Sequence, residues 1–515
     1  MPLLIQLYGL LSVLLRAGTL GSQSLTIGGI FFLLLVVERS QSDVELGRLR
    51  TLWWVRRWAV VLVGVQFVSL LLNTVILIGV GGVTLSEVIG GGFFRAGIVA
   101  IASALVIALA RPDRKQTHLL IPAALILASS VLTSHAISRL SARLPLLLLT
   151  ASHQGATAAW IGGLPYLLLS LKQLSPDAAQ ELSARFSRLA QISVGVLITA
   201  GTLLARAYLG SWGGLYGTSY GVMLAAKGVL FAFLLLLGFL NFRLVRVGVT
   251  SCDWILTRLK RLGEVEITVG FSVILAAASL TSLPPAVDLA TTGLVARSEI
   301  LTRFAPQWPG FYFSRSYPRQ EMYTVASTQS SWSEYNHHWA GLVVLAMGLL
   351  ALIARGGMGW AQNWPLLLFA LGVFIIYRAD PENWPLGPGG FWASFADPEV
   401  LLHRLFAILI VVFGTLERKV QSRLIRERVG LVFPMVVSLA GALLLTHSHN
   451  LGNIKEEALA ELSHTFLAVF AILAGSSRWL EVRLSSEDPI RRVTAWVWPL
   501  CLLLIGITLL DYREG

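Results

Sequence analysis

The chain contains 515 residues, of which 55% are hydrophobic and only 13% are charged. Soluble globular proteins carry roughly 25% charged residues, so this composition excludes a soluble fold, and two cysteines exclude a disulfide scaffold. The net charge of +12 does not indicate nucleic-acid binding, because the basic residues stand in short runs between apolar segments. We therefore predict an all-α, polytopic transmembrane helical bundle, with about 20 residues per bilayer-spanning helix.

Apolar segments of membrane-spanning length recur along the whole chain. We predict fourteen spans, at 18–37, 58–80, 94–110, 117–134, 148–170, 189–209, 217–241, 266–284, 339–354, 364–378, 401–416, 430–446, 460–475 and 494–511. Residues 2–15 are also apolar, and they either lengthen the first span or lie along the membrane interface.

The loops between the predicted spans alternate in charge. Basic residues follow every odd-numbered span, such as Arg56 and Arg57 after the first span and Arg355 after the ninth. Arg418 and Arg478 likewise follow the eleventh and thirteenth spans. Because cytoplasmic loops carry the excess of Lys and Arg, these loops are expected in the cytoplasm. The even number of spans then predicts that both termini are periplasmic.

One long polar connection, residues 286–338, interrupts the series on the predicted periplasmic side. Long connections between packed elements are usually functional segments or linkers. The connection predicts two bundles, an eight-span bundle at 1–285 and a six-span bundle at 339–515.

Eight of the nine histidines fall at the predicted periplasmic ends of spans, and His118 is the exception. The eight are His135, His153, His337, His338, His403, His447, His449 and His464. A single histidine at a membrane interface is usually just a solvated or capped polar side chain. The bias of the whole set instead favours a metal site, since imidazole binds copper, zinc, iron and nickel.

Carboxylates accompany some of these histidines at helical spacing. Glu399 precedes His403 by four residues, and Glu457, Glu461 and His464 follow one helical face. Carboxylates in such positions can orient imidazole ligands.

Lys227 lies near the middle of the seventh predicted span. A charge at this depth is costly, so it either serves a pathway as a gate, counter-ion or proton-linked group, or extends to the interface as a structural group. Gly162 and Gly163 in the fifth span favour close helix packing.

Several motifs combine in the first half of the chain. They are Thr133-Ser-His135-Ala, His153, Trp160-Ile-Gly162-Gly163, Tyr220-Gly221 with Lys227, and Leu280-Thr-Ser-Leu-Pro284-Pro285. On these motifs, residues 15–290 resemble the copper-resistance protein D family of bacterial inner-membrane proteins.

The second half of the chain looks like an extension carried by some members of that family. Its marks are Asn336-His-His-Trp-Ala340, Trp384-Pro-Leu-Gly-Pro388, Asp397-Pro-Glu-Val-Leu-Leu-His403, Leu445-Thr-His-Ser-His449 and Gly475-Ser-Ser-Arg-Trp479.

The resemblance implies that a multi-pass protein of the bacterial inner membrane captures copper at its periplasmic side and moves it across the membrane or delivers it. It also implies a separate periplasmic copper-binding protein as the donor. His135 and His153 are the candidates that match the family motifs, whereas the C-terminal histidines depend on their placement alone.

Two other functions stay open at this point. One is a b-type cytochrome with a single outer-side haem held by His135 and His153, or by His403 and His464. The other is an assembly factor that loads copper into another complex. The chain lacks H-E-x-x-H and phosphate-loop motifs, so an enzyme is not expected.

Overall fold

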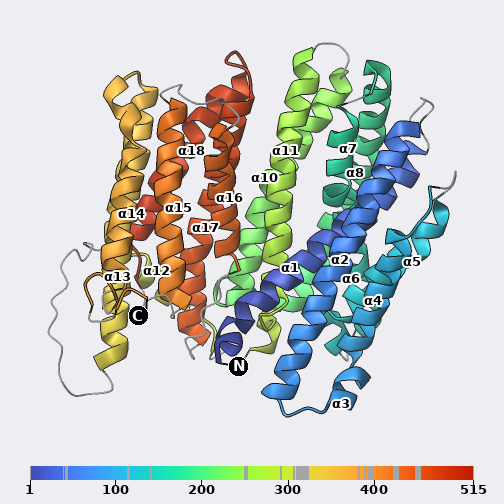
Figure 1. Cartoon of the computed structure of the whole chain (residues 1–515), viewed down its shortest axis with the longest axis horizontal. Helices are drawn as coiled ribbons and strands as arrows, with labels where there is room; N and C mark the ends of the chain where they lie inside the picture. Colours follow the sequence, from blue (N-terminus) through green and yellow to red (C-terminus); the bar gives the residue numbers. More distant parts are fainter. Residues whose placement is uncertain are drawn as a thin grey trace. The chain divides into compact units, whose positions relative to one another are not determined.

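The protein is described here from a computed structural model, which is helical throughout and has no strands in the part that it describes (Figure 1). That part comprises residues 2–38, 40, 45–112, 116–139, 142–172, 174–248, 253–289, 293–305, 308, 324–380, 383–387, 390–392, 398–421, 429–446 and 454–513. The predicted class, an all-α polytopic bundle, is confirmed.

The described residues form two compact units. Unit 1 extends from the N-terminus to residue 292 and also includes Thr446, and unit 2 holds the remainder. Unit 1 contains α1 (Pro2–Phe32), η1 (Leu33–Val37), α2 (Glu45–Gly79), α3 (Leu85–Gly90), α4 (Gly92–Ala108), η2 (Thr117–Leu119), α5 (Leu120–Leu132), η3 (His135–Ser138), α6 (Arg143–Thr157), η4 (Ala158–Gly162), α7 (Leu164–Ser170), α8 (Pro176–Leu209), α9 (Trp212–Tyr216), α10 (Ser219–Val247), α11 (Asp253–Leu280) and η5 (Ala286–Asp288). Unit 2 contains α12 (Arg297–Arg303), α13 (Thr324–Arg355), η7 (Gly359–Asn363), α14 (Leu366–Arg378), α15 (Pro398–Gln421), η9 (Val429–Leu431), α16 (Val432–Leu444), α17 (Ile454–Arg483) and α18 (Pro489–Leu510).

Among the described helices, nine are long and apolar enough to cross a membrane, and three shorter apolar helices accompany them, at Gly92–Ala108, Thr117–Leu132 and Val429–Leu444. Every one of the fourteen predicted spans coincides with a helical segment. The number of membrane crossings and the side of each terminus stay predictions.

Several helices are longer than the apolar windows that predicted them. Residues 2–15 lengthen the first helix rather than forming a separate segment, because α1 is continuous from Pro2 to Phe32. Helix α13 begins at Thr324, so the predicted connection at 286–338 is partly helical. Helix α17 continues to Arg483, well beyond residue 475. Hydropathy marks the part of a helix that matches the lipid core, whereas backbone hydrogen bonding carries the helix further.

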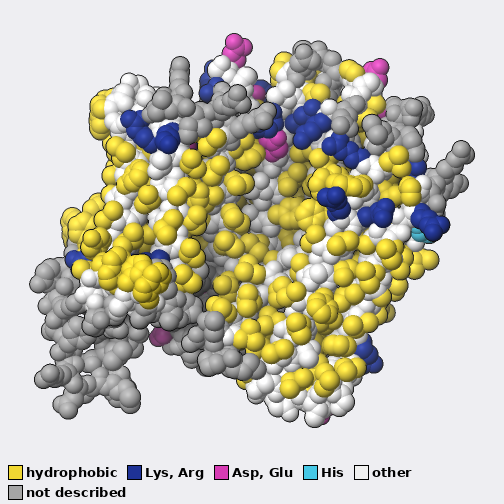
Figure 2. Space-filling model, in the orientation of Figure 1, with side chains coloured by type: hydrophobic (Ala, Val, Ile, Leu, Met, Phe, Trp, Pro, Cys, Tyr) yellow, Lys and Arg dark blue, Asp and Glu magenta, His cyan; other side chains and the backbone are white. Residues whose placement is uncertain are grey.

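Each unit presents apolar side chains outward. Hydrophobic residues cover much of the visible surface along the helices, and Lys and Arg side chains gather mainly toward helix ends (Figure 2). Phe67 on α2 and Ile408 on α15 are 59% and 57% exposed. Inside unit 1, by contrast, α1 buries Thr19, Gln23 and Thr26. Apolar side chains on the outside and polar side chains inside suit a protein that is surrounded by lipid, which supports the class of multi-pass membrane protein.

Helix α1 packs closely against η4, a single turn of π-helix between α6 and α7. A Cβ on Gly28 would overlap the carbonyl oxygen of Ala158, and a Cβ on Gly162 would overlap the carbonyl oxygen of Ser24. Small residues let backbones approach this closely in membrane bundles. The predicted packing role of Gly162 is confirmed, and this contact fixes the position of Trp160 within the same turn.

Unit 2 contains a buried charge network. Arg478 on α17 donates to Glu417 on α15 at 2.6 Å and to Glu481 at 2.7 Å. Arg355, at the end of α13, also pairs with Glu481, and the Trp498 indole of α18 donates to the same carboxylate. Arg478 was expected in a cytoplasmic loop but lies inside α17 with only 8% of its surface exposed. The network joins four helices.

Candidate functional site

Three of the predicted histidines surround Tyr512, which follows the last helix of unit 2 and is 2% exposed. The ring of His337 stacks on the Tyr512 ring with centroids 3.9 Å apart, and the ring of His464 meets it edge-on at 5.8 Å. His338 Nε2 lies 3.0 Å from the backbone oxygen of Tyr512. We call these four residues the Tyr512 cluster. Helices α13 and α17 supply its imidazoles.

Two imidazoles of the Tyr512 cluster are oriented by their own helices. His337 Nδ1 lies 2.8 Å from the carbonyl oxygen of Ser333, and His464 Nδ1 lies 2.8 Å from that of Ala460. Each carbonyl belongs to the residue four positions earlier, so each Nδ1–H donates along the helix. In a neutral ring this tautomer leaves the lone pair on Nε2, which is a common arrangement of metal-binding histidines.

His403 on α15 is fixed by a carboxylate that the sequence analysis did not select. Its Nδ1 lies 2.8 Å from Asp380 Oδ1, just beyond the end of α14. Both His403 and His338 lie in the neighbourhood of His337. The side chain of Glu399, the predicted partner of His403, lies outside the described part. Asp380 comes from a different helix, so no spacing rule within one helix could identify it.

Glu461 is 4% exposed and stands three residues before His464 on α17. Glu457 is half-buried one turn earlier, and its charge acts on Glu461. Both therefore lie on the face of α17 that carries His464, as the spacing indicated. His447 and His449 lie outside the described residues.

In unit 1, the two family-matched histidines have separate surroundings. His135 begins η3, and its Nε2 lies 3.2 Å from the backbone oxygen of Leu280. His153 lies on α6 beside Gly201 of α8, and its Nδ1 is buried without a hydrogen-bond partner. The charge of Lys227 acts on His153. The predicted shared site of His135 and His153 stays a prediction.

Within the described residues, no group of three or more His, Cys, Asp or Glu side chains is arranged to hold a metal ion. The Tyr512 cluster has three imidazoles, but an aromatic ring lies against two of them. It can serve as an imidazole-rich surface, and a metal ion would need the rings to turn.

Fold and site together define a polytopic helical membrane protein with imidazoles gathered in its second unit. Residues 180–280 match the family model described as copper resistance protein D, which confirms the predicted resemblance over that segment. The copper transport protein CutJ of Bacillus subtilis (strain 168) is 35% identical over 136 residues, which are 26% of this chain and 24% of that protein. The similarity thus spans about a quarter of either chain. No solved structure matches the chain.

The family-matched segment runs from α8 to the end of α11. It includes Lys227 but none of the eight predicted histidine ligands. The match therefore supports the segment from α8 to α11 as the family feature, and the histidines depend on their own geometry.

Proposed function

We propose that this protein handles copper in the bacterial inner membrane, capturing it on the periplasmic side and moving it across or delivering it to another protein. The observation that supports this most is the match of residues 180–280 to the copper resistance protein D model. The name of the Bacillus relative points to the same substrate. A separate periplasmic copper-binding protein would be the donor. On this proposal the protein is a transporter or delivery protein and not an enzyme.

Among the described histidines, we infer that the Tyr512 cluster receives the metal. It brings three imidazoles to one aromatic side chain, and the helix carbonyls orient two of those rings. The described donors are imidazoles and carboxylates rather than thiolates, and such donors suit Cu(II) better than a soft thioether site would. Protons compete with copper for imidazole, so capture should weaken as the pH falls.

The test is copper retention by the purified full-length protein. We expect the double variant His337→Ala, His464→Ala to bind Cu(II) at least about tenfold more weakly than the wild type, a loss of the size that disturbed metal sites show. His118→Ala is the matched control, because His118 is exposed in η2 and lies outside the cluster. Copper bound would be measured by metal analysis between pH 5 and pH 8.

Three results would contradict the proposal. Copper binding that survives in the double variant would exclude the Tyr512 cluster. Binding that does not change with pH would exclude imidazole ligands. A Soret band in the absorption spectrum, without bound copper, would instead favour a b-type cytochrome.

A further inference from the structure

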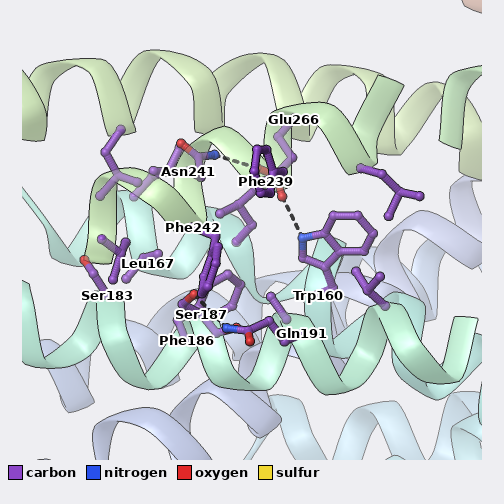
Figure 3. A pocket seen from close by; sticks show the side chains of 18 residues that line it. Trp160, Leu167, Ser183, Phe186, Ser187, Gln191, Phe239, Asn241, Phe242 and Glu266 are labelled. Atoms are coloured by element: carbon purple, nitrogen blue, oxygen red, sulfur yellow. Dashed lines mark hydrogen bonds between the residues drawn. The ribbon is translucent and has the colours of Figure 1, made fainter. Parts of the chain in front are cut away.

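A cavity of about 250 Å³ lies inside unit 1, between η4 and α7 on one side and α8, α10 and α11 on the others (Figure 3). Most of its wall is apolar or aromatic. No sequence motif marks this cavity, and the Tyr512 cluster belongs to the other unit. The cavity is therefore independent of the histidines proposed to bind copper.

A single carboxylate faces this cavity. Glu266 on α11 is 2% exposed, and it accepts hydrogen bonds from Trp160 Nε1 at 2.6 Å and Asn241 Nδ2 at 2.7 Å. It is the sole titratable side chain among the residues that line the cavity. Ionisable groups at membrane depth are costly and mark functional positions more often than structural ones.

Two further polar atoms at the cavity wall have no partner. Ser183 is 1% exposed, and its Oγ makes no hydrogen bond; Asn241 Oδ1 is likewise buried and unpaired. Buried polar atoms are normally satisfied by protein, water or ligand. Asn241 Oδ1 can only accept a hydrogen bond, and the carboxylate of Glu266, when ionised, can likewise only accept. A molecule in the cavity would therefore satisfy them by donating.

The cavity reaches the surface of unit 1 between two candidate membrane-spanning helices. Two of its lining residues are exposed: Phe239 on α10, at 54%, and Gln191 on α8. Figure 3 shows the Phe242 ring in the space between α10 and α8. A molecule dissolved in the lipid could therefore enter sideways, with a flat head group held among aromatic rings.

We propose that the cavity binds a lipid-soluble ring compound whose hydroxyl groups donate hydrogen bonds, of the quinol class. One hydroxyl donates to the adjacent acceptors Glu266 and Asn241 Oδ1, which a hydrogen bond of 2.7 Å joins, and the hydroxyl at the opposite end of the ring donates to Ser183 Oγ on α8. The rings of Trp160 and Phe242 contact the head group. The hydrocarbon tail leaves past Phe239 toward the lipid. An acyl chain alone would leave Asn241 Oδ1 and Ser183 Oγ unpaired, and a phospholipid head group is too polar for this lining.

The experiment measures binding of decylubiquinol to the purified full-length protein, without copper, by equilibrium partition. We expect Glu266→Gln and Asn241→Leu each to weaken binding about tenfold. Glu264→Gln is the matched control, because Glu264 is two residues earlier on α11 and pairs with Arg261 at 2.6 Å. Thermal unfolding of each variant checks that the fold is retained. The His337→Ala, His464→Ala variant should bind the quinol normally, which separates this test from the copper test.

Two other probes with the same tail identify the head group that the cavity selects. Decylubiquinone keeps the ring but has no hydroxyl donor, so it should bind about tenfold more weakly than the quinol. Decylamine carries a cationic donor without a ring and should also bind more weakly. Equal binding of all three, tighter binding of the amine, or quinol binding that ignores both cavity variants would each overturn the proposal.

Discussion

Arg478 has both of its terminal guanidinium nitrogens bound to carboxylates, at Glu417 and Glu481, and almost no contact with solvent. Removing one member of a buried ion pair leaves the other charges uncompensated, which is far more destabilising than losing an exposed pair. The network therefore stabilises unit 2 through charge balance rather than through the strength of any single bond.

We predict that Arg478→Met lowers the free energy of unfolding by about 3–5 kcal/mol. Arg492→Met on α18 is the control; Arg492 is exposed, so its loss should change the stability by no more than about 0.5 kcal/mol. Denaturant unfolding in detergent, followed by tryptophan fluorescence, compares the two. Equal stability of both variants would mean that the network contributes little.

Single residues differ in how well the sequence foretells their roles. Lys227 stands out because its neighbours are apolar along a whole span. Glu266 was overlooked because it begins the predicted span at 266–284, where a charge looks like an interface residue. Arg478 was assigned to a loop for the same reason. In both cases the helix extends past the apolar window, and the partners, Trp160 and Glu417, come from distant parts of the chain.

At the level of elements, the contact between α1 and η4 determines where Trp160 lies. π-Helical turns are often found at functional positions. Here the turn carries the indole that donates to Glu266, and Gly28 and Gly162 allow the backbones to meet. The glycine pair in the fifth span could be read from the sequence, but Gly28 and the π-helical turn could not, because no local pattern distinguishes them.

We predict that Gly28→Ala destabilises the protein by about 1–3 kcal/mol or more, because its new methyl group would meet the backbone of η4 rather than a movable side chain. Gly64→Ala on α2 has open space around the added Cβ and should instead stabilise the helix by about 0.5–1 kcal/mol. Thermal unfolding of both variants measures the difference. A Gly28→Ala protein as stable as the wild type would show that α1 and η4 can separate without cost.

On the scale of the whole molecule, hydropathy and charge predicted the helical class and every helical segment that became a span candidate. A bilayer-spanning helix needs about 20 mostly apolar residues in a row, so a local stretch of sequence is enough to predict each span. The gathering of His337, His338 and His464 at Tyr512 is not local. It depends on how α13, α17 and the end of α18 pack, and no spacing rule contains that information.

The topology prediction is tested with reporter fusions. Fusions after residues 48, 114, 260, 423 and 483 should report the cytoplasm, and fusions after 310, 390 and 453 should report the periplasm, because positive loops stay inside. The loop after α15 is the most informative, since its basic residues set the side of the whole second unit. A periplasmic signal from the fusion at 423 would place the Tyr512 cluster on the cytoplasmic side.

The charge network of unit 2 also has a consequence for how the chain is made. Synthesis proceeds from the N-terminus, so Arg355 is inserted before Glu417, and both are inserted before Arg478 and Glu481. Until α17 arrives, each earlier helix carries a charge with no counter-charge from its final partner. A buried charge without its counter-charge is costly, and the pairing offsets that cost. We predict that a chain that stops before α17 leaves Arg355 and Glu417 without these partners, so that its second unit is less stable than that of the full chain.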